Sequence, residues 1–407
     1  MTVDKNGRYR ASDLPNGRYR VTVQKNGAQV AVRENVAVNI ASGTEVSFTG
    51  GAGVQDLDRV EVTASSVPMI DISQTDTRSV FTAEQIGQIA VGRDIASVAL
   101  LAPSVTYNSS YTNDAGNTIP SFGGAASSEN AYYINGYAVT NPLTNLGSTT
   151  LPFDAIDQQQ ILTGGYGAEF GRSTGGAVNL VTKRGTNEWK GGVYTIWSPE
   201  ALRASPRDSF YPNTGFYGPD NPDPTKRTDG TLYIDRGRNN SWTNTTGAYV
   251  GGPIVPDKLF IYADVEMTKR EGQGVGASTA SAPGTANGYQ EFGYEYPRWA
   301  AKIDWNITDN HLIEFTGISD VSEYNSTGYA FDYATMTPVG EQNAGVHEKD
   351  DSKLYIAKYT GWLTDDLTVS ALYGRQKIEH TQSPWGYDPA CPRTSSSASA
   401  RVPGIPA

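Results

Sequence analysis

One short segment has the residue types of a catalytic site. Gly171-Arg172-Ser173-Thr174-Gly175 matches the G-x-S-x-G pattern, in which the serine is the nucleophile of a hydrolase. That chemistry needs a helix after the serine, and a histidine and an acidic residue brought close to it. Here Gly176 and the strand-like run 177–181 follow instead. We therefore expect a chance match and no enzyme, and keep a soluble serine hydrolase as a remote alternative.

Metal chemistry has few candidate residues. The chain has a single cysteine, Cys391, and three widely spaced histidines, His311, His347 and His380. These are too few for a zinc cage. The acidic stretch 220–229 misses the EF-hand spacing and is typical of a solvated loop. We expect no metal site and no cofactor.

Composition excludes other classes of protein. The 407 residues include 43 acidic and 32 basic side chains, for a net charge of -11. This balance argues against a nucleic-acid partner, because such proteins present a concentrated basic face. No run approaches the roughly 18 consecutive apolar residues of a membrane helix. A membrane role therefore requires a surface helix or a β-barrel, whose alternating strands leave no hydropathy peak.

The second half of the chain alternates between apolar and polar residues. From 299 to 307 the odd positions are Trp, Ala, Ile, Trp and Ile, whereas Lys302 and Asp304 lie on the other side. Such alternation predicts strands with one apolar and one polar face. Seven candidate strands share this pattern, at residues 189–197, 242–250, 259–267, 299–307, 312–318, 354–363 and 367–373.

The connections between these strands alternate in length. The short ones are at 256–258, 308–310 and 364–366, and the long ones at about 198–240, 271–291 and 323–350. Soluble sandwiches and propellers share the strand pattern. Short turns on one side and long loops on the other are typical of an outer-membrane barrel.

A barrel fixes which face of each strand meets lipid. An Arg or Lys at the bilayer midplane costs ~2–4 kcal/mol, so Arg298, Lys302 and Asp304 are expected to face a polar lumen. We therefore expect Ile303→Arg to impair membrane assembly and Lys302→Gln to be tolerated.

The first half of the chain predicts two small domains. Residues 1–50 contain the turn signals Asn6-Gly7 and Asn16-Gly17, followed by alternating strands, and indicate a small β-sandwich. Further on, Thr82 and Gln85 form a capping box ahead of two short helices. Brief strands at 131–134, 159–163 and 177–182 complete a compact α/β domain.

A separate β-prone run lies between these two domains. It consists of Val60, Glu61, Val62, Thr63 and Ala64, within a polar and turn-rich stretch. An isolated strand of this kind is either a sheet edge or a peptide that another protein's sheet can take up.

Several segments together resemble a known family. Residues 151–156, 160–179 and 182–188 look like the plug signature of TonB-dependent outer-membrane receptors, in the Oar-like branch. Residues 129–136 resemble the preceding plug strand, and 251–260 resemble the first barrel hairpin. Residues 1–50 are similar to the carboxypeptidase regulatory-like domain, a carbohydrate-binding type of fold, and Val60–Ala64 sits where the TonB box is expected.

The resemblance implies a mainly β fold, namely a partial outer-membrane antiparallel β-barrel with an α/β plug domain, preceded by a small β-sandwich. The expected domains are an incomplete carboxypeptidase regulatory-like sandwich (1–50), a linker with the TonB box (51–80), the plug (81–187), the first barrel strands (188–382) and a loop or disordered tail (383–407). The expected plug-motif residues are Asn135, Gly136, Gly164, Gly165, Tyr166, Gly167, Glu169, Phe170, Gly171, Arg172, Gly175 and Gly176. Their glycines are expected to permit tight turns.

The resemblance also implies a function. Such a receptor binds an external substrate and admits it through the plugged barrel, with energy from the TonB complex of the inner membrane. The chain would lie in the outer membrane of a Gram-negative bacterium, in contact with lipid, with its N-terminal domain and TonB box in the periplasm. The alternative is an adhesion or binding protein of the same architecture without transport. Because seven strands are far fewer than the 22 of a plugged barrel, and no signal peptide opens the sequence, we expect a fragment of a longer receptor.

Overall fold

The computed structural model describes about three quarters of the chain. The described residues are 9, 17–25, 28–38, 46, 48, 77–107, 118–204, 206–212, 230–276, 278–279, 282–333, 335–364 and 367–384. The β-prone run 60–64, the acidic stretch 220–229 and residues 385–407 lie outside them. No helix in these described ranges is long and apolar enough to cross a membrane.

The N-terminal part described is a β-hairpin. Strands β1 (Gly17–Lys25) and β2 (Ala28–Val38) pair antiparallel. Tyr19, Val21 and Val23 are half-buried while the residues between them are exposed, so these three side chains share one face as predicted. The β-sandwich itself stays a prediction, because the described residues of this region form one hairpin.

Residues 77–182 form a compact α/β domain. Its sheet has the order β3-β8-β9-β6-β7, with strands β3 (Thr77–Thr82), β8 (Ile156–Gly164), β9 (Ala177–Thr182), β6 (Ala131–Ile134) and β7 (Tyr137–Ala138). Helices α1 (Ala83–Gln88) and α2 (Ile95–Ala99) precede a small ladder of β4 (Val105–Thr106) and β5 (Ser121–Phe122). Ile134, Ile161 and Leu180 in the sheet are almost fully buried, and burial of such a side chain contributes about 1.5–3 kcal/mol.

The start of this domain differs from the prediction in one respect. The capping box forms as expected, since the Thr82 N–H donates to Gln85 Oε1 at 3.0 Å at the beginning of α1. However, residues 77–80, placed in the linker, belong to β3 and pair with β8. The strand was missed because it is short and its polar face carries Thr77 and Ser79.

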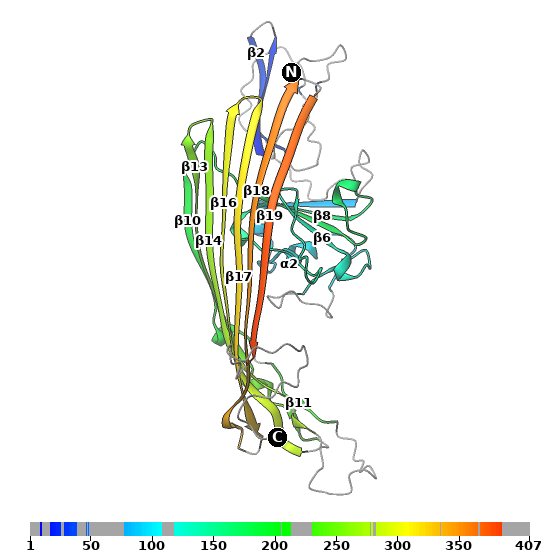
Figure 1. Ribbon diagram of the computed structural model, residues 1–407, viewed down its shortest axis with the longest axis vertical. Coiled ribbons are helices and arrows are strands. Elements are labelled where there is room, and N and C mark those ends of the chain that lie inside the picture. The colour runs from blue at the N-terminus through cyan, green and yellow to red at the C-terminus, as the bar shows by residue number, and fades with distance from the viewer. Residues whose placement is uncertain are drawn as a thin grey trace.

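A long antiparallel sheet follows, with its seven main strands in sequence order. They are β10 (Lys190–Ser198), β13 (Asn240–Val255), β14 (Leu259–Val275), β16 (Ala282–Thr308), β17 (His311–Asp332), β18 (Thr337–Thr364) and β19 (Leu367–Pro384). Smaller strands are β11 (Ser209–Phe210), β12 (Leu232–Ile234) and β15 (Ser278–Thr279). All seven predicted strands are confirmed. Figure 1 shows them as one curved sheet with the α/β domain against one side.

Two of the predicted long loops are wrong. Most of 271–291 and of 323–350 is paired strand, because β14, β16, β17 and β18 continue to within a few residues of their turns. Ser383 and Pro384, assigned to the tail, likewise lie in β19. A strand of 28 residues spans about 90 Å, whereas the apolar zone of a membrane barrel is about 25 Å tall. Beyond that zone neither face has a continuous apolar environment, so the ladder continues without the hydrophobic periodicity that marks a strand in a sequence.

The extended hairpins carry a second small core. It consists of Val275, Tyr289, Phe331 and Tyr333. The Tyr333 hydroxyl donates to the Gly276 carbonyl at 2.8 Å and ties two hairpins together. The region beyond the apolar zone is therefore packed structure.

The two faces of the sheet differ as the alternation predicts. On the face toward the α/β domain, Asp264, Lys302 and Asp304 are 1, 4 and 0% exposed, whereas Val265 and Trp305 on the other face are 54 and 45% exposed. Large apolar residues gather on that outer face over the middle of the strands. We call them the apolar band: Val193, Val250, Ile261, Val265, Trp299, Ile303, Trp305, Ile313, Phe315, Tyr355 and Tyr373.

Candidate functional site

The predicted motif residues Asn135 and Gly136 make a tight turn at the sheet. They join β6 to β7 with φ of +51° and +85°, the backbone of a type I′ hairpin, which Asn-Gly favours. The Asn135 side-chain amide donates to Thr316 Oγ1 on β17 at 3.0 Å, and its carbonyl accepts from the Thr182 N–H at 3.0 Å. The turn therefore fastens the α/β domain to the wall of the sheet.

The segment from Gly164 to Gly176 folds over Tyr133. Phe170 packs edge-on against the Tyr133 ring at 5.4 Å between centroids, and the Tyr166 hydroxyl donates to the Gly175 carbonyl at 2.9 Å. Glu169 and Arg172 lie in this segment, Glu169 in a short 3-10 helix. The motif residues 164–176 are thus brought together as one structural unit.

The Ser173 hydroxyl is held by hydrogen bonds within the plug segment. Its hydroxyl oxygen lies 2.9 Å from the carbonyl oxygens of Glu129 and Gly176 and 3.1 Å from the Tyr166 hydroxyl. Each of the three histidines bonds to a residue of the long sheet instead. Strand β9, and not a helix, follows the serine. The arrangement that a serine hydrolase requires is not formed around Ser173.

The reason for the motif glycines differs from the prediction. Gly165 has a positive φ of +69°, as a tight turn requires. The other predicted glycines of this segment, Gly164, Gly167, Gly171, Gly175 and Gly176, do not, so the tight-turn explanation is wrong for them.

Two of these glycines are instead required by close packing. A Cβ at Gly176 would lie 2.4 Å from Phe122 Cγ, and one at Gly175 would lie 2.6 Å from Asn130 Oδ1. At Gly164 an added Cβ would meet nothing within 4 Å. Close approach of the backbone to neighbouring side chains therefore selects glycine at 175 and 176.

The wall facing the α/β domain is lined with ion pairs. Arg298 Nε lies 2.7 Å from Asp320 Oδ1, and Lys302 Nζ lies 2.9 Å from Glu314 Oε1 and 3.6 Å from Asp304 Oδ1. Buried charges of this kind are retained only with partners. The sequence-based expectation that this face is polar is confirmed, although much of it is covered by protein.

Arg93 connects the α/β domain to this wall. Its guanidinium lies 2.9 Å from Asp154 in its own domain and 3.6 Å from Glu266 on β14. It also lies over the rings of Phe153 and Tyr194, at 4.8 and 5.3 Å from the centroids. Burial opposes the charged form, but the hydrogen bond and charge of Asp154 outweigh it, so the pKa of Arg93 lies above its ordinary value. Arg93 thus stays a cation shared between the two parts.

The loop 139–150 makes a second set of contacts with the wall. The hydroxyls of Thr149 and Ser352 are 2.6 Å apart, and the Thr150 N–H donates to Asp320 Oδ2 at 2.7 Å. The Gln376 amide donates to Thr149 Oγ1 at 2.8 Å. These hydrogen bonds lie beside apolar packing, since Val139 belongs to one buried cluster with Ile318 and Leu354 of the wall.

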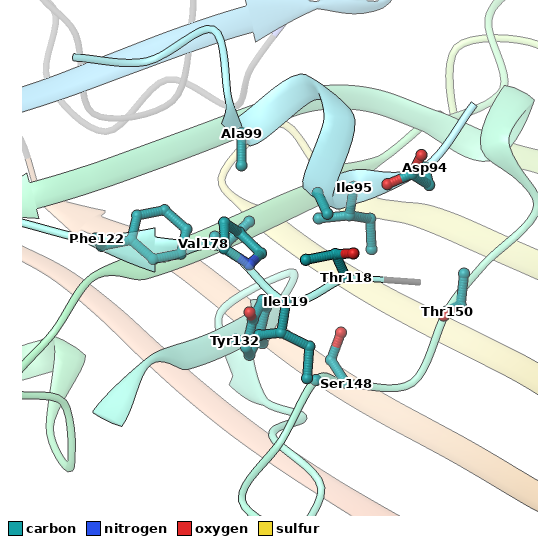
Figure 2. Close-up of a pocket in the computed structure, with 13 residues that line it drawn as sticks. Asp94, Ile95, Ala99, Thr118, Ile119, Phe122, Tyr132, Ser148, Thr150 and Val178 are labelled. Carbon is teal, nitrogen blue, oxygen red and sulfur yellow. The ribbon is translucent and has the colours of Figure 1, made fainter. Parts of the chain in front are cut away.

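Two hollows bear on where a substrate could bind. Figure 2 shows one of about 50 Å³ inside the α/β domain, lined largely by apolar residues such as Ile95, Phe122 and Val178. Burial raises the pKa of the Tyr132 phenol on its wall to about 12. A space of this size holds one or two water molecules, which excludes a substrate.

The second hollow is an open groove of about 550 Å³ beyond the apolar band. Its lining is polar and aromatic: Glu200, Trp242, Glu271, Gln273, Phe292 and Asn325. Within the described ranges, no group of three or more His, Cys, Asp or Glu residues is placed to hold a metal ion.

Comparison with known proteins agrees with this architecture. Residues 71–178 match the family model of the TonB-dependent Receptor Plug Domain. The chain is also 28% identical over 276 residues to the TonB-dependent transporter Oar of Myxococcus xanthus. Together these findings support a TonB-dependent receptor of the Oar type. The match covers 65% of the chain and 23% of the relative, so the chain spans about a quarter of that transporter's length.

Solved receptors are similar at lower identity. The ferric enterobactin receptor PfeA of Pseudomonas aeruginosa is 14% identical, with a TM-score of 0.44, over 76% of this chain and 41% of that protein. The outer-membrane transporter YddB of Escherichia coli is 13% identical, with a TM-score of 0.44, over 74% and 48% of the two chains.

Receptors of this family have a defined orientation. They are outer-membrane β-barrel proteins with the plug and N-terminus on the periplasmic side. The α/β domain carries the match to the plug family. In such barrels the apolar outer face meets lipid and the short turns are periplasmic. We therefore assign the apolar band to the lipid face, the turns at 256–258 and 309–310 to the periplasmic end, and the groove to the external end.

Sequence reasoning found only part of this site. The alternation identified Arg298, Lys302 and Asp304 as facing inward, and the plug signature identified Asn135. Sequence reasoning missed Arg93 and Thr149, because their contacts with the wall involve residues more than 150 positions away. No local signal marks either one, although Arg93 stands next to Asp94, the N-cap of α2.

Proposed function

We propose that this receptor takes up an external substrate through the barrel by TonB-coupled displacement of the plug. The observation that carries the proposal is the nature of the contact between plug and wall. It combines a buried apolar cluster, in which Val139 of the α/β domain meets Ile318 and Leu354 of the wall, with ion pairs and hydrogen bonds through Arg93, Asn135 and Thr149. The polar part of this contact favours displacement, because the groups freed from it are hydrated as water enters the lumen.

The coupling segment in this proposal is the TonB box, Val60–Ala64. An extended peptide of this kind binds by adding a strand to a partner's sheet through main-chain hydrogen bonds. The energy-transducing partner is TonB of the inner membrane, and residues 1–50 form a carboxypeptidase regulatory-like domain on the periplasmic side. The external groove, with its rings, amides and carboxylates, is the part of the described structure best suited to first contact with a substrate.

A disulfide between plug and wall tests the need for displacement. The Thr149 and Ser352 hydroxyls are 2.6 Å apart, so cysteines at these positions are within reach of each other. In the full-length receptor with Cys391→Ser, we expect Thr149→Cys/Ser352→Cys to block uptake when oxidised and to restore it when reduced. Ligand binding at the cell surface should persist in both states.

A matched control keeps the bridge within the wall. Thr245 and Thr268 face the lumen on β13 and β14, with hydroxyls 2.9 Å apart. Oxidised Thr245→Cys/Thr268→Cys should transport normally. Uptake by the oxidised plug-to-wall variant at the rate of this control would refute displacement at this contact. Binding without uptake in the wild-type receptor would identify the adhesion protein instead.

The TonB box requires its own test. Val62→Pro removes a main-chain donor and fixes φ, whereas Val62→Ala keeps the backbone competent for strand addition. We expect Val62→Pro to abolish uptake while surface ligand binding is retained, and Val62→Ala to be mild. Normal uptake by the proline variant would show that the receptor is coupled through another segment.

A further inference from the structure

The hairpin of β6 and β7 lies across three neighbouring strands of the wall. Its Asn135 amide donates to Thr316 Oγ1 on β17 at 3.0 Å. Its Tyr137 ring lies against Gly374 on β19. Thr316 pairs with Ile356 of β18, and Ile356 pairs with Gly374, so these three wall residues form one cross-strand row. We call Thr316, Ile356 and Gly374 the docking row.

Gly374 leaves the space that the Tyr137 ring occupies. A Cβ at position 374 would lie 2.5 Å from Tyr137 Cδ2 and 2.9 Å from its Cζ. Carbon atoms in favourable contact are about 3.5–4.0 Å apart, so any side chain here would displace the ring. Gly374 has no positive φ. The close approach of the ring, and not the backbone conformation, therefore requires glycine at this position.

The spacing of the two contacts suits the hairpin. Adjacent strands are about 4.8 Å apart, so Thr316 and Gly374 are separated by about 10 Å. Asn135 and Tyr137 are two residues apart, and their Cα atoms span at most about 7 Å. The amide of one and the ring of the other cover the rest. Ile356, between the two contacts, is 4% exposed and belongs to the same apolar cluster as Tyr137.

The neighbouring rows on this face do not offer the same pair of contacts. The next row toward the external end consists of Ile318, Leu354 and Gln376, and the next row toward the short turns consists of Glu314, Lys358 and Leu372. Neither row has a glycine on β19 or a hydroxyl on β17. A shift of the hairpin by one strand toward β16 would place Asn135 on Lys302 and the Tyr137 ring on Ile356.

We propose that the docking row sets the resting position of the plug within the barrel, with Tyr137 as the positioning residue. A ring fits only where the wall lacks a side chain, whereas an amide finds other partners on a polar wall. Packed contacts are sensitive to the addition of a single methyl group. The docking row concerns the plug at rest, so the proposal holds whether or not the receptor transports its ligand.

The rate of disulfide formation at a distant contact tests this proposal. In the full-length receptor with Cys391→Ser, the pair Thr149→Cys/Ser352→Cys reports whether the plug has its native position, at a contact outside the docking row. Overpacking by one methyl group shifts a packing equilibrium about tenfold. Gly374→Ala should therefore slow formation of this disulfide about tenfold.

Two comparisons separate positioning from a general loss of stability. In the control Gly361→Ala the new methyl group would meet the Tyr359 hydroxyl within the wall itself, and the rate should stay that of the parent pair. Tyr137→Phe keeps the ring and should also leave the rate unchanged. Tyr137→Ala should slow the disulfide, and Gly374→Ala should then have no further effect, because the two changes act on one contact.

Rates are compared among receptors that have assembled, as judged by the heat-dependent shift in gel mobility. The proposal is overturned if Gly374→Ala forms the disulfide at the parent rate, or if it slows the reaction equally with and without the Tyr137 ring. If Gly374→Ala does not assemble, Tyr137→Ala decides, since it leaves the wall unchanged. A parent rate for Tyr137→Ala also overturns the proposal.

Discussion

Substitution of Lys302 by glutamine is expected to destabilise the receptor. The Lys302 ammonium is 2.9 Å from Glu314 and 3.6 Å from Asp304, and the Asp304 side chain is fully buried. Neither oxygen of Asp304 accepts a hydrogen bond. Lys302→Gln removes the charge that compensates both carboxylates while keeping a side chain of similar length.

The size of the effect follows from what remains after the change. Removal of one partner of a buried ion pair typically costs about 3–5 kcal/mol. Arg184 lies 3.5 Å from Asp304 and keeps part of the compensation, so we expect about 3 kcal/mol, at the lower end. The sequence-based expectation that Lys302→Gln is tolerated assumed a water-filled lumen. Burial by the plug contradicts that assumption and reverses the expected outcome.

The assay is resistance of the full-length receptor to unfolding, followed by the heat-dependent shift in gel mobility and by urea titration. Lys302→Gln should unfold at lower temperature and lower urea concentration than the wild type. Lys302→Gln/Asp304→Asn should recover part of the loss, since it removes one of the stranded charges. The reasoning fails if Lys302→Gln matches the wild type, or if the double variant is less stable than the single one by the full cost of a second independent change.

Two further outcomes follow from the packing. Ile303→Arg places a cation in the apolar band at a cost of ~2–4 kcal/mol and should reduce the amount of receptor assembled in the outer membrane. Thr327→Arg, on the outer face beyond the band, should leave that amount unchanged. Equal amounts of the two variants in the membrane would contradict the assignment of the lipid face. Gly176→Ala should destabilise the plug by about 1–3 kcal/mol, because its methyl group would overlap the Phe122 ring. Gly164→Ala should change the urea midpoint little, and similar midpoints for the two variants would show that the ring moves aside freely.

Sequence reasoning located the membrane-crossing parts of the strands correctly, but it missed the extensions of the same strands beyond the apolar band. Between 299 and 307 one face meets lipid and the other meets the plug, so Trp299, Ile303 and Trp305 alternate with polar residues. Between 323 and 350 neither face meets lipid, and the alternation is lost although β17 and β18 stay paired. Hydrophobic periodicity reports the environment of a strand and not its hydrogen bonds.

The candidate site was predicted in a similar way, by local signals alone. The Asn135-Gly136 turn and the capping box at Thr82 and Gln85 depend on residues within three positions of each other, and both formed as expected. The glycines of the plug motif were found, but their reason was not, because Phe122 and Asn130 approach them from distant parts of the chain.

The sequence by itself predicted alternating strands and a plug domain, since alternation, turn chemistry and the plug signature are all local properties of the chain. Only the tertiary structure decided which charges meet. Arg93 reaches Glu266, Arg184 reaches Asp304 and Thr149 reaches Ser352 across 120 or more positions in every case. The energy of a buried charge depends on the charged and polar groups within a few ångströms of it, and the order of residues along the chain does not specify which groups these are.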